Sequence, residues 1–369
     1  MRLTLTLASP VAAGAAVTVA YTDPTGGDDV NAIHDLGGVD AVSLAALGVT
    51  NTTAPPTPQP PTNPPVTTIV DGVSVQTVSG TSPSGSAVHT VTIPVVSSTR
   101  VEQVGNNQLA DIPLVSDGAG SALLALQVPV GFGLTASGQS APRPAGASLA
   151  DLIREIREHT GSSQDQGQLG GAGTDFVNNL PEGTPLLVQA IQLQAGGGAT
   201  GTPLVIQGAP QSAVQTALVI DARTQPGAAI ELQNVEFAAI IGAATVTGGA
   251  GSQHVWGDSA SQSIFLGADD DVLNGGGGND TVGSAGGDDQ VRGDDGDDVV
   301  FGGEGADTVH GNAGADTARG DAGDDRVYGG KGDDQVFGGA DNDLLFGDLG
   351  QDTLQGNTGH DTLDGGGDN

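Results

Sequence analysis

In the last third of the chain, one apolar residue recurs at every ninth position, between polar residues and glycines. A period of nine is typical of solenoids in which short strands alternate with tight turns, and it predicts that one side chain of each unit points inward. One apolar side chain in nine residues makes a thin core. The eleven apolar positions are Leu273, Val282, Val291, Val300, Val309, Ala318, Val327, Val336, Leu345, Leu354 and Leu363.

An aspartate stands two positions before each of these apolar residues. The surrounding frame reads Gly-Gly-x-Gly-x-Asp-x-U-x, where U is apolar, and it is seen cleanly in residues 302–310 and 329–337. Its nine positions are numbered from the first glycine. The position-six aspartates are Asp271, Asp280, Asp289, Asp298, Asp307, Asp316, Asp325, Asp334, Asp343, Asp352 and Asp361.

This frame has the chemistry of a calcium site. Glycines at positions one, two and four allow positive φ and tight turns, so that carbonyl oxygens can converge, and position six adds a carboxylate. Calcium accepts roughly six to eight such oxygens at about 2.3–2.6 Å, whereas magnesium demands a stricter geometry. We expect the eleven aspartates to bind calcium together with the backbone carbonyls of position-one and position-four glycines. Those glycines are Gly275, Gly278, Gly293, Gly296, Gly302, Gly305, Gly311, Gly314, Gly320, Gly323, Gly329 and Gly332.

The charge of this region favours metal-coupled folding. From Asp258 onward, 26 of the chain's 44 acidic residues face only four basic ones, which leaves a net charge of −22. Burial of one Val or Leu contributes roughly 1.5–3 kcal/mol, whereas ordering each backbone unit costs about 1–2 kcal/mol. Cations must therefore offset both the thin core and the repulsion. A disordered, acidic tail is the alternative, but disorder gives no reason for aspartate and apolar residue to keep one register eleven times.

With this frame, residues 266–369 resemble the RTX calcium-binding β-roll of proteins secreted by Gram-negative bacteria. In that family two nonapeptides form one coil, and each calcium ion lies between turns that are 18 residues apart. The resemblance implies two ladders of aspartates on opposite edges, with five and four gaps, and therefore at most nine ions. One ladder holds Asp271, Asp289, Asp307, Asp325, Asp343 and Asp361, and the other holds Asp280, Asp298, Asp316, Asp334 and Asp352.

Some repeats depart from the frame. Ser284 and Ala285 replace the first two glycines of one repeat, and Asp269 and Asp341 replace the position-four glycine of two others. We expect weaker sites at those turns.

The spacing of apolar residues continues backward through 230–265, where Gln253 and Gln262 replace the position-six aspartate. We expect 230–265 to form metal-free coils that cap the start of the solenoid. Trp256, the only tryptophan, is expected to cover the apolar end of the roll, and His254 to be solvated.

The first part of the chain suggests a modular surface protein. Residues 1–53 alternate in the manner of β-strands and resemble the second half of an immunoglobulin-like repeat found in long bacterial surface proteins. Residues 54–66 form a Pro-rich linker that favours polyproline II. Because Met1 opens inside the repeat and the chain stops within a nonapeptide, we expect a fragment of a longer protein.

Residues 67–229 are predicted to be a β-rich region, which begins with a β-sandwich or irregular β domain up to about residue 142. One amphipathic helix is expected over 149–159, opened by a capping box at 148–151, and a polar loop over 161–173. The whole chain is therefore expected to be all-β, with one short helix and a C-terminal parallel β-roll.

No catalytic motif is present. Secreted proteases with such rolls use H-E-x-x-H, and the six histidines form no such pair. Related lipases use G-x-S-x-G, and the nearest match, residues 80–84, lacks the final glycine. A triad made of distant residues stays open, because triads are defined by geometry. We expect no enzymatic activity from this chain.

Composition narrows the partners and the compartment. A net charge of −34 disfavours binding to nucleic acid. The absence of cysteine excludes disulfides and thiolate metal sites. The sequence has no run of 18 apolar residues and therefore predicts no membrane helix. Extracellular fluid supplies calcium at the roughly 10⁻⁴–10⁻³ M that extracellular modules use. We therefore expect the protein outside the cell or at the surface of a Gram-negative bacterium.

Two functional classes remain. The first is a calcium-stiffened structural or adhesive protein, with cell-surface or matrix components as partners. The second is the secretion and folding module of a toxin or hydrolase whose catalytic domain lies outside this chain. In both, the family resemblance implies export by type I secretion machinery.

Overall fold

A computed structural model of the protein describes residues 16–21, 44–50, 64–83, 85–100, 109–194, 196, 201–210 and 214–367. The chain divides into two compact units, residues 1–62 and 63–369. In the first unit, β1 (Ala16–Tyr21) and β2 (Leu44–Thr50) form an antiparallel two-stranded sheet. This pair does not confirm the immunoglobulin-like resemblance of residues 1–53. Residues 54–63 of the predicted linker lie outside the described residues.

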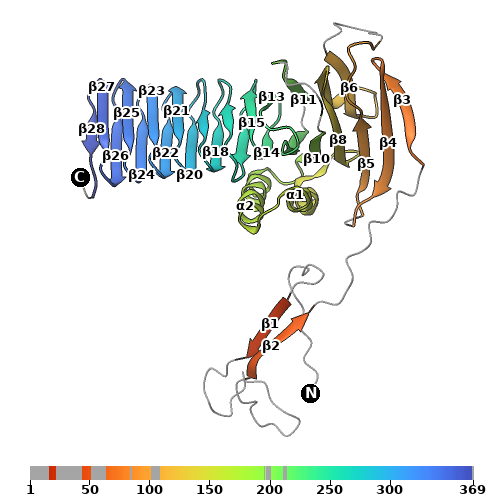
Figure 1. The fold of residues 1–369 in the computed structure, drawn as a ribbon, viewed down its shortest axis with the longest axis horizontal. Helices are drawn as coiled ribbons and strands as arrows, with labels where there is room; N and C mark the ends of the chain where they lie inside the picture. Colours follow the sequence, from red (N-terminus) through yellow and green to blue (C-terminus); the bar gives the residue numbers. More distant parts are fainter. Residues whose placement is uncertain are drawn as a thin grey trace. The chain divides into compact units, whose positions relative to one another are not determined.

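The second unit begins with antiparallel strands in two facing sheets (Figure 1). Along these strands apolar side chains alternate inward, as in β7, where Leu124, Leu126 and Val128 are fully buried. The long sheet contains β3 (Val66–Val70), β4 (Val73–Thr81), β5 (Ala87–Ile93) and β8 (Gly133–Gln139), with β9 (Arg143–Pro144) at its side. The short sheet contains β6 (Leu109–Ser116) and β7 (Ala122–Pro129).

Parallel strands then continue the same two sheets to the C-terminal end of the unit. In the long sheet they are β10 (Pro185–Gln194), β12 (Gln215–Asp221), β14 (Phe237–Ile241), β16 (His254–Gly257), β18 (Val272–Gly277), β20 (Gln290–Asp295), β22 (Thr308–Ala313), β24 (Arg326–Lys331), β26 (Leu344–Leu349) and β28 (Thr362–Asp364). In the short sheet they are β11 (Leu204–Gly208), β13 (Ala228–Gln233), β15 (Ala244–Gly248), β17 (Ser263–Phe265), β19 (Thr281–Gly283), β21 (Val299–Glu304), β23 (Thr317–Ala322), β25 (Gln335–Ala340) and β27 (Thr353–Thr358).

The strand register confirms the predicted parallel β-roll. Val291 pairs with Val309, and Val309 pairs with Val327, so one coil contains 18 residues, or two nonapeptides. Parallel pairing begins earlier than the predicted residue 230, because β10 pairs antiparallel with β8 on one side and parallel with β12 on the other. In the short sheet β11 makes the same change between β7 and β13.

One apolar core runs between the two sheets from Val73 to Leu345. In the antiparallel part several side chains of each strand enter it, whereas in the roll the position-eight side chains line it in single file. Nine of these eleven side chains, from Leu273 to Leu345, are fully buried, as the sequence predicted. Leu354 is only partly buried, and Leu363, in the last strand, is 46% exposed.

Two helices cover the outer face of the long sheet where the roll begins: α1 (Ala145–His159) and α2 (Ser163–Asn179) (Figure 1). They bury a second apolar cluster, in which Phe176 stacks on Phe237 with ring centroids 5.1 Å apart. Trp256 packs at the margin of this cluster, on the flank of the roll and not at its end. The ring centroids of His254 and Phe176 lie 5.6 Å apart, and burial lowers the pKa of His254. His254 is therefore half-buried against α2, and not fully solvated as expected.

The prediction of one helix was wrong in its number and in its start. Helix α2 occupies most of the segment expected to be a polar loop, and α1 begins at Ala145, three residues before the expected capping box. Ser148 lies buried inside α1, where its hydroxyl accepts a hydrogen bond from Gln139 Nε2 (3.0 Å). A true cap stands at the start of α2, where Ser162 Oγ accepts the backbone N–H of Asp165 (3.0 Å).

The sequence does not predict helix α2 because the segment contains four glycines, and each glycine costs about 1 kcal/mol of helix stability relative to alanine in a helix interior. Packing explains one of them. A Cβ at Gly173 would lie 3.0 Å from Leu152 Cδ2 and 3.4 Å from Ile156 Cδ1, so glycine lets α1 and α2 approach closely.

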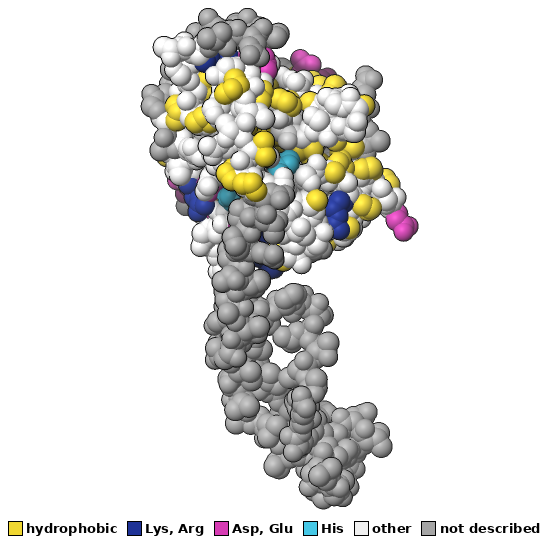
Figure 2. All heavy atoms as spheres, turned by 90° about the vertical axis from the view of Figure 1, so that its right-hand side faces the viewer, with side chains coloured by type: hydrophobic (Ala, Val, Ile, Leu, Met, Phe, Trp, Pro, Cys, Tyr) yellow, Lys and Arg dark blue, Asp and Glu magenta, His cyan; other side chains and the backbone are white. Residues whose placement is uncertain are grey.

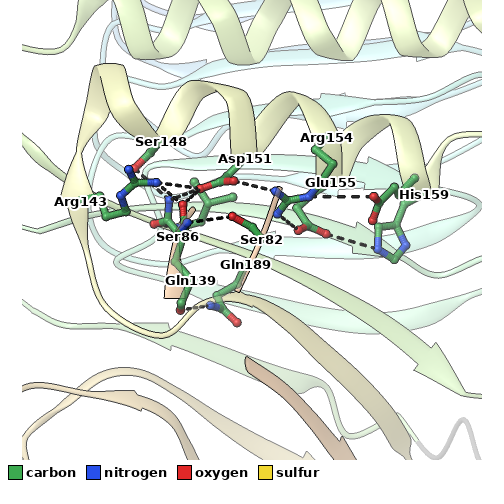
Figure 3. A network of polar contacts seen from close by, with 12 residues as sticks. Ser82, Ser86, Gln139, Arg143, Ser148, Asp151, Arg154, Glu155, His159 and Gln189 are labelled. Carbon is green, nitrogen blue, oxygen red and sulfur yellow. Dashed lines mark hydrogen bonds and ion pairs between the residues drawn. The ribbon is translucent and has the colours of Figure 1, made fainter. Parts of the chain in front are cut away.

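Buried ion pairs fix α1 to its neighbours (Figure 3). Asp151 accepts Arg154 at 2.6 Å, Arg143 at 3.3 Å and the Ser86 hydroxyl at 2.8 Å. At the other end of the helix, His159 lies 3.5 Å from Asp221 of β12. Each carboxylate is held by several partners, as a buried charge requires. The network therefore ties the antiparallel part, the helix and the first coil of the roll together.

The acidic charge is unevenly distributed. Figure 2 shows the antiparallel end of the second unit, where hydrophobic and uncharged side chains predominate and Asp and Glu are few. On the outer strand β3, Val66 and Ile69 are 60% and 64% exposed. Most acidic residues lie instead in the roll.

Candidate metal centre

Each position-six aspartate directly precedes a strand of the roll. Asp307 precedes β22 of the long sheet, and Asp298 precedes β21 of the short sheet. Because every coil crosses from one sheet to the other, aspartates nine residues apart fall on opposite edges, and aspartates 18 residues apart stack on one edge. The structure therefore brings these residues together in the two predicted ladders.

Hydrogen bonds connect the rungs of each ladder. The backbone N–H of Asp289 donates to Asp307 Oδ1 (2.8 Å), and the N–H of Asp307 donates to Asp325 Oδ1 (2.9 Å). The same bond joins every pair of neighbouring rungs in both ladders, at 2.7–3.1 Å. Gln253 and Gln262 extend the ladders backward, because their N–H groups donate to Asp271 and Asp280.

The second oxygen of most of these carboxylates has no such partner. Among the described residues, nine ladder aspartates have a buried Oδ2 atom without any hydrogen bond. A buried carboxylate oxygen needs a donor or a cation, because leaving a charge unpaired in the interior is very unfavourable. The nine are Asp280, Asp289, Asp298, Asp307, Asp316, Asp325, Asp334, Asp343 and Asp352.

The carbonyl oxygens of position-one glycines lie close to these Oδ2 atoms. A Cβ built on Gly302 would lie 2.4 Å from Asp307 Oδ2 and 2.5 Å from the carbonyl oxygen of Gly320, one coil further on. A carboxylate oxygen of one coil and a position-one carbonyl of the next therefore converge on one small space, which only glycine leaves open. The same convergence occurs at Gly275, Gly311, Gly329, Gly338 and Gly347.

Position-four glycines are required by the backbone. Gly296 has φ of +136°, and a Cβ on it would lie 1.8 Å from the carbonyl oxygen of Gly278 in the coil before. Gly305 and Gly314 show the same approach at 1.9 Å.

In the last coils, the carbonyl oxygens that converge near ladder carboxylates belong to Gly347, Gly356 and Gly365. These glycines occupy position one but are not among the predicted ligands.

Burial makes the metal-free ladder carboxylates weak acids. It raises their pKa values, and the charges of neighbouring aspartates add to the effect, while the hydrogen bond donated by the backbone N–H of the preceding rung opposes it. The pKa is raised to about 7 for Asp271, Asp280, Asp316 and Asp325, and to about 6 for Asp298, Asp307 and Asp334. The fold thus concentrates carboxylates that resist ionisation unless a cation accompanies them.

One departure from the frame changes a rung. Ser284 Oγ, where the frame has a glycine, lies 3.1 Å from the carbonyl oxygen of Gly267 and 3.4 Å from Asp271 Oδ2. The hydroxyl occupies part of the space that a position-one glycine leaves open elsewhere. We therefore still predict weak calcium binding between Asp271 and Asp289, because the Ser284 hydroxyl reduces the space for the ion.

The donor set fits a hard cation held by few charges and many neutral oxygens. In the described part of the chain, no three His, Cys, Asp or Glu side chains gather into a metal cluster. An ion would depend on carboxylates from neighbouring rungs and on backbone carbonyl oxygens, which calcium accepts. Nor does any described helix have the length and apolarity needed to cross a membrane.

Comparison with known families agrees with this geometry. The model of the RTX calcium-binding nonapeptide repeat matches four segments, residues 247–282, 283–318, 310–345 and 346–369. The first match includes the coils that carry Gln253 and Gln262. Searches of curated proteins and of solved structures returned no match. Residues 247–369 of this chain are therefore RTX calcium-binding nonapeptide repeats, folded as a parallel β-roll.

Proposed function

We propose that this chain is a secreted or cell-surface structural protein with an adhesive role, whose roll folds when extracellular calcium binds to the two aspartate ladders. The observation that carries the proposal is the set of nine buried ladder oxygens without a hydrogen bond. They lie beside glycine carbonyls, in coils whose core is one side chain wide.

Calcium supplies positive charge at the ladders. The aspartates of neighbouring rungs would hold each ion through Oδ2, and position-one carbonyl oxygens would complete its ligand set. Five gaps in one ladder and four in the other allow at most nine ions. A ligand that binds only the folded state stabilises it by about 2.7 kcal/mol per site at 100-fold excess over Kd. Several sites on one stack would therefore give a sharp calcium dependence.

This dependence suits type I export. In the low calcium of the cytosol, the −22 charge from Asp258 onward would keep the roll open and threadable, and folding outside would prevent its return. Limited proteolysis tests this step. We expect rapid cleavage within 266–369 at submicromolar calcium and protection at millimolar calcium, and a protease-resistant roll at submicromolar calcium would contradict it.

Folding itself is tested on the full chain by far-ultraviolet circular dichroism during a calcium titration. In chelator we expect part of the β signal to be absent, because the antiparallel part keeps its own thick core while the roll is open. Millimolar calcium should restore the signal cooperatively, and calorimetry should count several ions. Magnesium at the same concentration is the control and should restore little of the β signal. A β signal in chelator that calcium leaves unchanged would refute the proposal.

We propose no catalytic role for the chain. Ser82, from the nearest match to a lipase motif, accepts the backbone N–H of Ser86 at 3.1 Å, as a turn residue does. The second candidate, a secretion module for a separate catalytic domain, is favoured by the concentration of acidic residues in the roll. The neighbouring coding sequence discriminates the two, since further immunoglobulin-like repeats favour adhesion and a hydrolase motif favours the second candidate.

A further inference from the structure

A cavity of about 440 Å³ lies on the outer face of the long sheet, between α2 and the first coils of the roll. It is separate from both aspartate ladders, which lie along the edges of the sheets. Its polar and aromatic lining consists of Gln168 of α2, Trp256, Asn274, Arg292, Asp294, Asp295 and Asn312. Its volume is in the range of small-molecule sites in proteins, about 300–1,000 Å³.

The sheet register places three of these side chains in one row. Trp256 of β16 pairs with Asn274 of β18, and Asn274 pairs with Arg292 of β20. They occupy position nine of successive coils, directly after the buried position eight, and therefore point outward. An aromatic ring, an amide and a guanidinium thus form one wall of the cavity.

Helix α2 closes the other side and fixes the polar groups. Gln168 Nε2 donates to Asp294 Oδ2 (3.2 Å) and reaches Asn274 Oδ1 at 3.5 Å. Asn312 Nδ2 donates to Asp294 Oδ1 (2.8 Å). The Asp294 carboxylate is therefore held in place by two amides, while Asn274 itself is only 2% exposed.

Arg292 is the group without a partner. Among the described residues its guanidinium forms no ion pair within 4 Å and no hydrogen bond, although it lies in the most acidic part of the chain. An arginine side chain offers five N–H donors. The cavity thus contains free donors on Arg292, oriented acceptors on Asp294 and an apolar surface on Trp256.

We propose that this cavity binds a saccharide of one or two neutral sugar rings. A hydroxyl group both donates and accepts hydrogen bonds, so it can pair with Asp294 and Arg292 at once, and the apolar C–H face of a pyranose can lie against the Trp256 ring. A phosphorylated or highly anionic ligand is disfavoured by Asp294 and Asp295 at the same wall. The proposal rests on the proposed function only in requiring a folded roll, and it supplies a ligand class for adhesion.

The single tryptophan gives a direct assay. The full chain in millimolar calcium is titrated with the methyl glycosides of glucose, galactose, mannose and N-acetylglucosamine and with their β-linked disaccharides, and Trp256 fluorescence is followed. We expect a saturable change in emission with at least one of these probes. Circular dichroism on the same sample shows whether the roll is folded, so that failure of folding and failure of binding are distinguished.

Two substitutions test the assignment of the groups. Asp294→Gly removes the acceptor yet installs the glycine of the frame's position two, where Asp294 has a φ of +77°, so the roll should remain folded. We expect at least tenfold weaker binding from this variant and from Arg292→Ala. The matched control is Asp321→Gly, at position two of the short sheet with φ of +79°, which should bind normally. A folded roll that binds none of the probes, or Asp294→Gly binding like the wild type, would overturn the proposal.

Discussion

Replacing one ladder aspartate should change the stability of the roll in opposite directions with and without calcium. The substitution Asp307→Asn keeps an oxygen that can accept the N–H of Asp289, so the hydrogen-bonded ladder is preserved. It removes the charge from a carboxylate whose Oδ2 atom is buried and has no hydrogen bond. The change therefore isolates the electrostatic role of the position.

The magnitude follows from the place of Asp307 in its ladder, between Asp289 and Asp325. With calcium at 100-fold excess over Kd, each site contributes about 2.7 kcal/mol, so loss of two sites should lower the free energy of unfolding by about 5 kcal/mol. In chelator at pH 8 the sign should reverse. Burial raises the pKa of Asp307 to about 6, which means that ionisation opposes folding there, and asparagine removes that cost.

The matched control is Asp333→Asn at position five. Asp333 Oδ1 also accepts a backbone N–H one coil further on, from Gln351 (2.9 Å), but on the exposed side of the turn. Because asparagine keeps this bond and no buried charge is involved, the free energy of unfolding should change by less than about 0.5 kcal/mol. In calcium, urea denaturation followed by circular dichroism measures stability, and calorimetry counts the ions. In chelator, where the wild-type roll is open, a larger β signal in Asp307→Asn than in the wild type measures the reversed sign. If both variants lose the same calcium and stability, the segment attracts cations through its bulk charge, and the ladder reasoning is wrong.

Two further outcomes test other parts of the structure. In chelator, the roll should be most stable below about pH 4 and lose stability as the pH rises through about 6–7, because burial raises its ladder pKa values and the folded state therefore prefers protonated aspartates. The β signal in circular dichroism between pH 4 and 8 measures this, and a signal that grows as the pH rises would contradict it. Gly305→Ala should destabilise the folded roll by about 3 kcal/mol or more in thermal melts, because its φ is +134° and a Cβ would lie 1.9 Å from the Gly287 carbonyl oxygen. The control Gly167→Ala, in open space on α2, should stabilise the protein by up to about 1 kcal/mol. Equal effects of the two substitutions would show that the coil spacing tolerates a methyl group.

The roll was predictable because its structure is local and repeated. Every coil uses the same contacts at a separation of 18 residues, so aspartate at position six and an apolar residue at position eight suffice to place Asp307 between Asp289 and Asp325. The same logic locates the position-one carbonyls, apart from those of the last coils.

Features that depend on distant contacts were not predictable. The glycines of α2 hide its helical character in the sequence. Gly173 is needed because Leu152 of α1 packs closely against it, a contact that the local sequence does not reveal. The continuity of the two sheets across β10 depends on pairing with β8, about fifty residues earlier, and no local pattern encodes it. The surroundings of Trp256 likewise depend on α2, where the sequence predicts a loop.

The junction at β10 and β11 has a consequence for how the roll assembles. Starting a stack is the slow step of any cooperative one-dimensional growth, because the first unit orders many residues for few contacts, as the first turn of a helix does. Here the antiparallel part presents two finished strands on its thick core, and β12 and β13 add to them in parallel. The growing roll therefore never needs a nucleus of its own. Coils should add in sequence from the β10 end, each completed coil serving as the seed for the next, so that assembly becomes elongation without a lag.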